Sequence, residues 1–233
     1  MTPRVAPGRA HDPAATRGAL ISAATRVFAE RGFQGARVDE IARRSGVNKA
    51  MINYHFAGKA GLYREILAAG FGEFRRQLEP VRASRGSAEA RLRGFATAMA
   101  ALAASRPFFF TMVLREVTSD GSPMDDEVIG HIMSIVEIDQ EIIVQGIKDG
   151  AFRDVDPLLA HLSFAGALIF VFATAPFRQR MAAAGAKRRV RARGGSAGRC
   201  PVFPSLESFA EHHHDLFTRG LSRRARTTTR RSP

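Results

Sequence analysis

The stretch that decides the fold is residues 32–62, GFQGARVDEIARRSGVNKAMINYHFAGKAGL. Apolar residues recur at helical spacing over about 38–44, which predicts one short amphipathic helix. A second short helix is expected over about 48–54, and Gly46 lies between the two, where a tight turn favours a residue without a β-carbon. The pattern therefore predicts a helix-turn-helix.

Longer helices are expected on both sides of this stretch. Residues 16–31 have apolar residues on one helical face and are followed by Gly32, a residue type that commonly ends helices. Another helix starts at about Lys59 and is expected to end by Pro80, because proline removes a backbone hydrogen bond inside a helix. The first three helices are expected to form one small domain over residues 16–58.

Residues 59–222 predict a second helical domain. Alternating strand patterns are not found, whereas helical spacing recurs almost throughout. Beyond Pro80, helices are expected from Ser87 to about Ala104, from Pro107 through Val117, from about Asp125 to Lys148, from Pro157 over the following 20 residues, and from about Ser205 to Ser222. The packed stripe expected within 125–148 is Ile129, Ile132, Met133, Val136, Ile143 and Ile147. The predicted fold class is all-α, a three-helix helix-turn-helix domain followed by a helical bundle.

Positive charge is concentrated in three parts of the chain. Of 35 Lys and Arg against 22 Asp and Glu, residues 1–80 carry 13 against 7, residues 180–200 carry 7 against none, and residues 219–233 carry 6 against none. The remainder is mildly acidic, so one part of the chain is expected to meet a polyanion, with nucleic acid as the leading partner and an anionic membrane surface second. Flexible basic segments are expected at residues 1–15 (arm), 181–204 (loop) and 223–233 (tail).

The second short helix has residue types that suit the DNA major groove. A helix presented by its N-terminal end can enter this groove, which is about 12 Å wide, when its outward side chains are small or polar. Ile52 and Phe56 should instead face the core. Base contacts are expected from Asn48, Lys49, Ala50, Met51 and Asn53, and phosphate contacts from Arg37, Tyr54, His55 and Lys59.

The same region resembles the TetR family of bacterial regulators. The resemblance is carried by Phe28, Gly32, Phe33, Ile41, Ala42, Gly46, Val47, Tyr54, His55, Phe56, Lys59 and Leu62, and the string INYHFAGKAGLY over 52–63 looks like the CerR-like subgroup. It implies a sequence-specific transcriptional regulator, most often a repressor that a small molecule releases from its operator. Two residues depart from the family pattern: Arg37 stands where Ser or Thr is frequent, and Asn53 where an aromatic residue is frequent. The operator sequence therefore cannot be transferred from other members.

The resemblance also implies roles for the second domain, namely an enclosed apolar effector and dimerisation. The candidates for an effector pocket, which equally suit plain core packing, are Phe95, Met99, Phe109, Met112, Val113, His131, Phe164 and Leu168. The candidates for a homodimer interface are Leu162, Phe170, Phe209, Leu216 and Phe217. A two-fold dimer predicts a near-palindromic operator on double-stranded DNA, with half-sites ~34 Å apart. No cofactor is expected.

An alternative reading places the chain at a membrane. Residues 157–177 carry no formal charge and approach the ~20 residues that a bilayer span requires, which would suit a membrane-associated DNA-binding or adaptor protein. His161, Ser163 and Pro176 interrupt the stretch, so a helix buried in a dimer is the favoured interpretation, without a membrane. The single cysteine, Cys200, and the absence of an apolar leader predict a cytoplasmic protein.

Catalysis and metal binding are not expected. The sequence contains no Gly-x-Ser-x-Gly, His-Glu-x-x-His, phosphate-loop or dinucleotide-binding motif, which argues against an enzyme. His212, His213 and His214 are consecutive, and consecutive helix positions point about 100° apart, so these imidazoles are poorly placed to share one ion.

Overall fold

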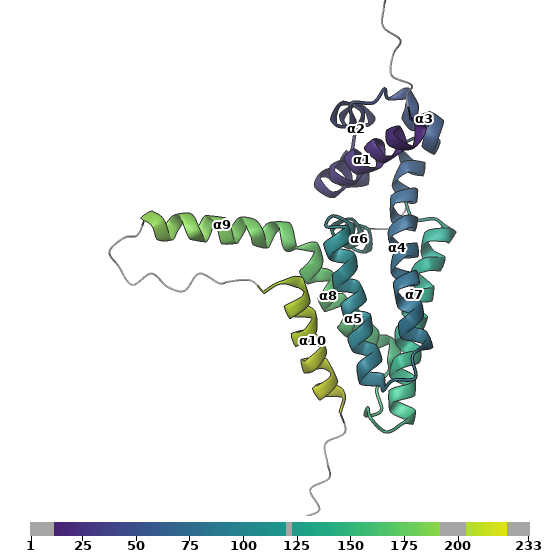
Figure 1. Ribbon diagram of the computed structural model, residues 1–233, viewed down its shortest axis with the longest axis vertical. Helices are drawn as coiled ribbons and strands as arrows, with labels where there is room; N and C mark the ends of the chain where they lie inside the picture. The colour runs from purple at the N-terminus through teal and green to yellow at the C-terminus, as the bar shows by residue number, and fades with distance from the viewer. Residues whose placement is uncertain (1–11, 120–122, 192–203, 223–233) are drawn as a thin grey trace, which may run out of the picture.

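The computed structural model describes residues 12–119, 123–191 and 204–222. Within these ranges the chain forms ten helices, which confirms the all-α prediction. The helices are α1 Pro13–Gly35, α2 Val38–Ser45, α3 Ala50–Phe56, α4 Lys59–Ala83, α5 Ala88–Ser105, α6 Phe109–Val117, α7 Asp126–Lys148, α8 Pro157–Ala173, α9 Ala175–Arg191 and α10 Leu206–Leu221 (Figure 1). Helices α1 to α3 form a head above a bundle that contains α4 to α8 and α10.

Helix α1 starts earlier and ends later than the sequence predicts. The Asp12 side chain accepts a hydrogen bond from the Ala14 backbone N–H at 2.9 Å, and Pro13 takes the first helical position, where its missing N–H costs nothing. The helix bends at Gly32, whose φ of 70° is left-handed, and continues to Gly35. Residues 13–15 are therefore helical rather than part of a flexible arm.

Helix α4 connects the head to the bundle. It leaves the head at Lys59 and runs alongside α7 (Figure 1). The prediction that it ends by Pro80 is wrong, because the helix continues to Ala83. Its last turn is held by tertiary contacts: Arg82 forms a 2.6 Å ion pair with Glu141 of α7, and the Arg91 guanidinium of α5 donates to the Val81 carbonyl.

The buried face of α7 differs from the predicted stripe. Ile129 and Met133 are exposed, whereas the buried residues are Val128, Ile135, Ile138, Asp139, Ile142, Ile143 and Gly146. The helical period was predicted correctly, but α7 packs against three helices, α4, α5 and α8, so its buried face is broad. An acidic residue, Asp139, lies at the middle of that face and was not expected there.

Helix α9 replaces part of a predicted loop. Residues 181–191, assigned to a basic loop from sequence, continue a helix that projects away from the bundle (Figure 1). The arm before residue 12, the loop segment 192–203 and the tail 223–233 lie outside the described residues. Among those that are described, no single helix is long and apolar enough to cross a bilayer, although two bent helix pairs pass by length and composition, one of them α8 with Ala175–Ala184 at a 50° bend.

Candidate nucleic-acid interface

The turn between α2 and α3 has the geometry expected of a helix-turn-helix. Gly46 has a φ of 68°, a left-handed conformation that residues with a β-carbon rarely adopt. The Asn48 side-chain oxygen accepts from the Ala50 backbone N–H at 2.9 Å, which satisfies one free N–H at the start of α3. This hydrogen bond commits the oxygen of Asn48 to the helix and leaves its NH2 group as the donor that can face DNA.

One edge of α3 is outward and the other is anchored. Asn48, Lys49, Ala50, Asn53 and Tyr54 are exposed, and the Tyr54 side chain reaches 78%. Met51 is half-buried. Ile52 and Phe56 are buried in the same core as α1 and α4, as the sequence predicts. Four of the five base-contact candidates therefore share one exposed surface with the phosphate candidate Tyr54. We call this surface the recognition edge, defined as Asn48 to Ala50 with Asn53 and Tyr54.

Lys49 is held by a neighbouring acid. Its ammonium lies 3.0 Å from the carboxylate of Asp39 in α2, and both side chains are largely exposed. Arg37 is also exposed and precedes α2 without capping it through its side chain, as expected for a residue that replaces a hydroxyl. Lys49, within the recognition edge, is thus paired inside the head, and Arg37 is a second exposed cation at the start of α2.

Lys59 is placed differently from the other phosphate candidates. Its ammonium donates to the carbonyls of Phe33 at 3.0 Å and Ala36 at 3.2 Å, and it lies 4.5 Å from the Phe33 ring centroid. These contacts give Lys59 a structural role, because they fasten the end of α1 to the start of α4. His55 is half-buried, its ring touches Tyr54, and its Nε2 is buried without a partner among the described residues.

An ion-pair network orients α2 on α1. The Arg44 guanidinium donates to Glu30 of α1 at 2.8 and 2.9 Å and to Glu40 of α2 at 2.7 Å. These hydrogen bonds lower the pKa of Glu30, and hydrogen bonds from Arg43 and Arg44 lower the pKa of Glu40. The network is exposed, so its contribution to stability is small. Its contacts with Glu30 join α2 to α1 beside the recognition helix.

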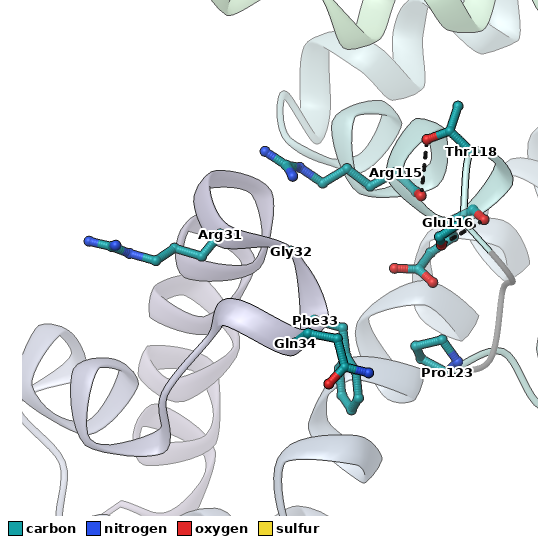
Figure 2. Close-up of a pocket in the computed structure, with 9 residues that line it drawn as sticks. Arg31, Gly32, Phe33, Gln34, Arg115, Glu116, Thr118 and Pro123 are labelled. Atoms are coloured by element: carbon teal, nitrogen blue, oxygen red, sulfur yellow. Dashed lines mark hydrogen bonds between the residues drawn. The ribbon is translucent and has the colours of Figure 1, made fainter.

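Helix α6 links the head to the bundle. The Arg115 guanidinium donates to the carbonyls of Ala29 and Glu30 near the end of α1, and the buried Tyr63 hydroxyl of α4 donates to the Glu116 carboxylate at 2.5 Å. Burial raises the pKa of the Tyr63 hydroxyl, and the adjacent Glu116 carboxylate adds to this effect. In Figure 2 the bend at Gly32 faces α6 across a cleft of about 300 Å³.

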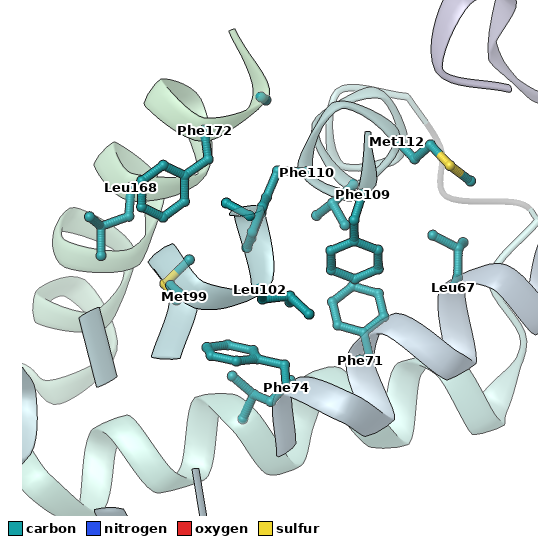
Figure 3. Close-up of a cluster of buried hydrophobic side chains, with 14 of the residues drawn as sticks. Leu67, Phe71, Phe74, Met99, Leu102, Phe109, Phe110, Met112, Leu168 and Phe172 are labelled. Carbon is teal, nitrogen blue, oxygen red and sulfur yellow. The ribbon is translucent and has the colours of Figure 1, made fainter. Parts of the chain in front are cut away.

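The predicted pocket residues lie mostly in one buried core. Phe109 and Met112 pack near α4, where Phe109 meets Phe71 at a ring distance of 5.0 Å (Figure 3). Phe95 and Phe164 form a second part of this core, with ring centroids 6.2 Å apart. The other buried candidates are Met99, Val113 and Leu168. His131 is separate from these, because it is half-buried beside Gly72 of α4.

The predicted interface residues divide into two groups. Leu162, Phe170 and Leu216 are exposed by 57%, 60% and 59%, which leaves an apolar surface on α8 and α10. Phe209 and Phe217 are partly buried against the bundle, in ring contact with His213. His214 is also engaged, since its Nε2 lies 2.9 Å from the Glu89 carbonyl of α5.

A buried polar pair was missed from the sequence. Asp139 of α7 is 0% exposed, and its Oδ2 lies 2.8 Å from Nδ1 of His161 in α8. The only signal was the position of Asp139, which lies one helical turn after Ile135 and one turn before Ile142 and Ile143, on the same helical face. It was overlooked because the stripe predicted for this helix passed over position 139.

Comparison with known proteins supports this arrangement. A family model described as bacterial regulatory proteins, tetR family, matches residues 20–66, and a model described as tetracyclin repressor-like, C-terminal domain, matches residues 85–173. The HTH-type transcriptional regulator RutR of Escherichia coli O157:H7 is 30% identical over 163 residues, covering 67% of this chain and 72% of RutR. The HTH-type transcriptional activator FasR of Mycolicibacterium smegmatis is 47% identical over 51 residues, covering 22% of this chain and 23% of FasR.

A solved structure extends the similarity to the whole fold. FadR from Bacillus subtilis, in complex with stearoyl-CoA, superposes with a TM-score of 0.66 at 18% identity and covers 88% of this chain and 98% of that chain. At this identity the likeness concerns the fold alone. The two family models, the identity to RutR and the exposed edge of α3 lead to one conclusion: the chain belongs to the TetR family of bacterial DNA-binding transcriptional regulators.

Proposed function

We propose that this regulator is a homodimeric repressor that binds a near-palindromic operator and is released by a small, largely apolar effector. The observation that carries the proposal is the recognition edge, which is exposed on a helix anchored from behind by Ile52 and Phe56. A short helix held in this way can enter the major groove without losing core contacts.

Within the recognition edge, Asn53 and Lys49 are the proposed readers of sequence. An amide can form two hydrogen bonds with adenine, and an ammonium can reach a guanine edge. Lys49 must exchange its contact with Asp39 for one with DNA, which is inexpensive because the pair is exposed. Arg37 and Tyr54 are the proposed phosphate contacts, which fix register without reading bases.

The apolar surface on α8 and α10 supports the dimer. Leu162, Phe170 and Leu216 expose more than half of each side chain to solvent in a single subunit. A second copy that packs the same surface by a two-fold axis would bury all three and place two heads on one face of DNA.

Contacts between the bundle and the head support release by an effector. The Thr111 hydroxyl of α6 donates to the Ala173 carbonyl of α8 at 2.9 Å, and Arg115 of α6 donates to the end of α1. A molecule that displaces α8 or α6 would therefore shift the head. It can lower DNA affinity only to the extent that it binds the shifted state more tightly.

Selection of bound DNA tests the proposal. Fragments retained by the purified protein from a random library should converge on a two-fold sequence, and Asn53→Ala and Lys49→Ala should change preference at specific base positions while leaving the fold intact. Glu211→Ala, which removes an exposed side chain of α10 far from the head in sequence, is the matched control. A library that stays random at low salt contradicts DNA recognition.

A reporter gene placed behind the selected operator then gives the sign of regulation, and activation would contradict the repressor role.

A further inference from the structure

The Asp139–His161 pair has one oxygen for which the described residues supply no hydrogen-bond donor. Asp139 Oδ2 meets His161 Nδ1 at 2.8 Å, but Oδ1 is buried and has no hydrogen-bond partner among the described residues. Asp139 is fully buried and His161 is 7% exposed. A buried acceptor without a donor is destabilising, and the great majority of such atoms in folded proteins are paired. A retained orphan at this depth calls for a donor from outside the described residues.

The surroundings of the pair are aromatic and apolar. The rings of His161 and Phe95 are T-shaped to each other, with their centroids 6.5 Å apart. The Phe95 ring centroid lies 5.4 Å from that of Phe74 and 6.2 Å from that of Phe164. Met99 lies one turn after Phe95 on α5, and its unbranched side chain can change rotamer to make room. The site therefore combines an apolar enclosure with one acceptor, a combination typical of small-molecule sites.

A water molecule matches this site poorly. Buried waters usually make about three hydrogen bonds, whereas Asp139 Oδ1 is the only unpartnered buried side-chain atom on α7 and α8 among the described residues. A hydroxyl on an apolar molecule needs a single acceptor for its proton, and its remaining surface suits the aromatic side chains. A charged donor matches less well, because the aromatic and apolar side chains around the pair would leave a buried cation poorly solvated beyond this single oxygen.

We propose that Asp139 Oδ1 is the polar anchor of the effector site and accepts a hydrogen bond from the hydroxyl of an uncharged, otherwise apolar effector lying between α5, α7 and α8. The inference rests on the proposed function, because it names the chemical class of the molecule that releases DNA. It also explains how binding reaches the head, since α8 carries both His161 and the carbonyl of Ala173 to which α6 is bonded.

Three size-matched probes test the chemistry. 4-Propylphenol has a hydroxyl donor, 4-propylanisole has an oxygen without a donor, and 4-propyltoluene has no polar atom. Binding to the full chain is measured by calorimetry and by the shift in melting temperature. We expect 4-propylphenol to bind about tenfold more tightly than the other two, because only its hydroxyl satisfies the buried oxygen. Equal affinities, or binding of none of the three, would overturn the proposal.

Variants assign the preference to the acceptor. Asp139→Leu should abolish the preference for the phenol, whereas Asp139→Asn, which retains an acceptor oxygen, should keep most of it. Ile142→Leu, a volume-conserving change one turn away, is the matched control and should keep the full preference. Should Asp139→Leu fold poorly because His161 loses its partner, the double variant Asp139→Leu with His161→Leu removes both polar groups. A phenol preference that persists in the leucine variants would overturn the proposal.

DNA binding distinguishes failure of the proposed function from failure of the effector anchor. Without a probe, the wild type and Asp139→Leu should bind operator DNA with equal affinity, because Asp139 lies in the bundle and not in the head. Loss of DNA binding by the wild type itself would count against the proposed function. Operator binding without any phenol preference would count against the effector anchor alone.

Discussion

Among single residues, Lys49 and Asp39 together set the charge that the free head carries at the recognition edge. The Lys49 ammonium is paired with Asp39, whose carboxylate also adds a negative charge beside the recognition edge. Asp39→Asn should therefore strengthen binding to arbitrary DNA at low salt by about two- to fivefold, the range expected for one exposed ion pair. The measurement is fluorescence anisotropy with a random-sequence duplex across a salt series.

The control for this variant changes the same charge elsewhere. Asp154 is exposed between α7 and α8, so Asp154→Asn alters net charge equally without approaching the recognition edge. An equal gain for both variants would mean that total charge, rather than the position of Asp39, governs binding.

Burial of the Asp139 side chain should make the free energy of unfolding depend on pH. Burial raises the pKa of Asp139 above its ordinary value of 3.8, against the opposing effect of His161. Its contribution to the free energy of unfolding is therefore full below pH 3.8 and decreases as the pH rises through the raised folded-state pKa. Asp139→Asn does not titrate at this position, so it should gain stability relative to wild type as the pH is raised from about 4 toward neutral.

Urea denaturation at fixed protein concentration, repeated at intervals between pH 4 and pH 7, measures this difference. Ile142→Leu supplies a control in which no titrating group changes, and its difference from wild type should not vary with pH. A difference between wild type and Asp139→Asn that is equally constant over the range would contradict the raised pKa.

Between elements, the packing of α4 on α6 depends on a glycine. A β-carbon built on Gly70 would lie 2.2 Å from the Phe109 ring, closer than atoms can approach. Gly70→Ala should therefore lower the free energy of unfolding by about 1–3 kcal/mol, the usual cost of overpacking. Gly130→Ala on α7 is the matched control, because a β-carbon there would have no atom within 4 Å and alanine favours helix. Denaturant titration compares the two, and equal effects would contradict the close contact.

The elements of the head could be predicted from sequence because local rules determine them. Helix spacing, the left-handed Gly46 and the apolar Ile52 and Phe56 all depend on near neighbours in the chain. The end of α4 could not, because its turn after Pro80 is held by Glu141, which is distant in sequence. Helix α9 was missed because its charge was given more weight than its alanine and arginine content, which favours helix.

In the candidate site, too, features set by one helix could be predicted from sequence, whereas contacts between distant residues could not. The exposure of the recognition edge follows from the face of one helix, whereas Met51, a base-contact candidate of the same helix, is half-buried. Lys59 differed because its ammonium meets two carbonyls at the end of α1, a tertiary contact without a local sequence signal. The Asp139–His161 pair likewise depends on two helices meeting in space.

For the molecule as a whole, the proposed function requires two paired heads, and the exposed apolar face of α8 is part of the interface proposed to pair them. Leu162→Glu puts a charge into an apolar surface that is 57% exposed in one subunit and buried in the proposed dimer. Burying an unpaired carboxylate opposes association strongly, so the variant should be monomeric at micromolar concentration and bind the selected operator at least tenfold more weakly. Light scattering after gel filtration gives the mass, and anisotropy gives the affinity. Met133→Glu on α7, where the methionine is 51% exposed, makes the same change outside the proposed interface and should leave both unchanged. A dimeric Leu162→Glu protein with full operator affinity would place the interface on another surface.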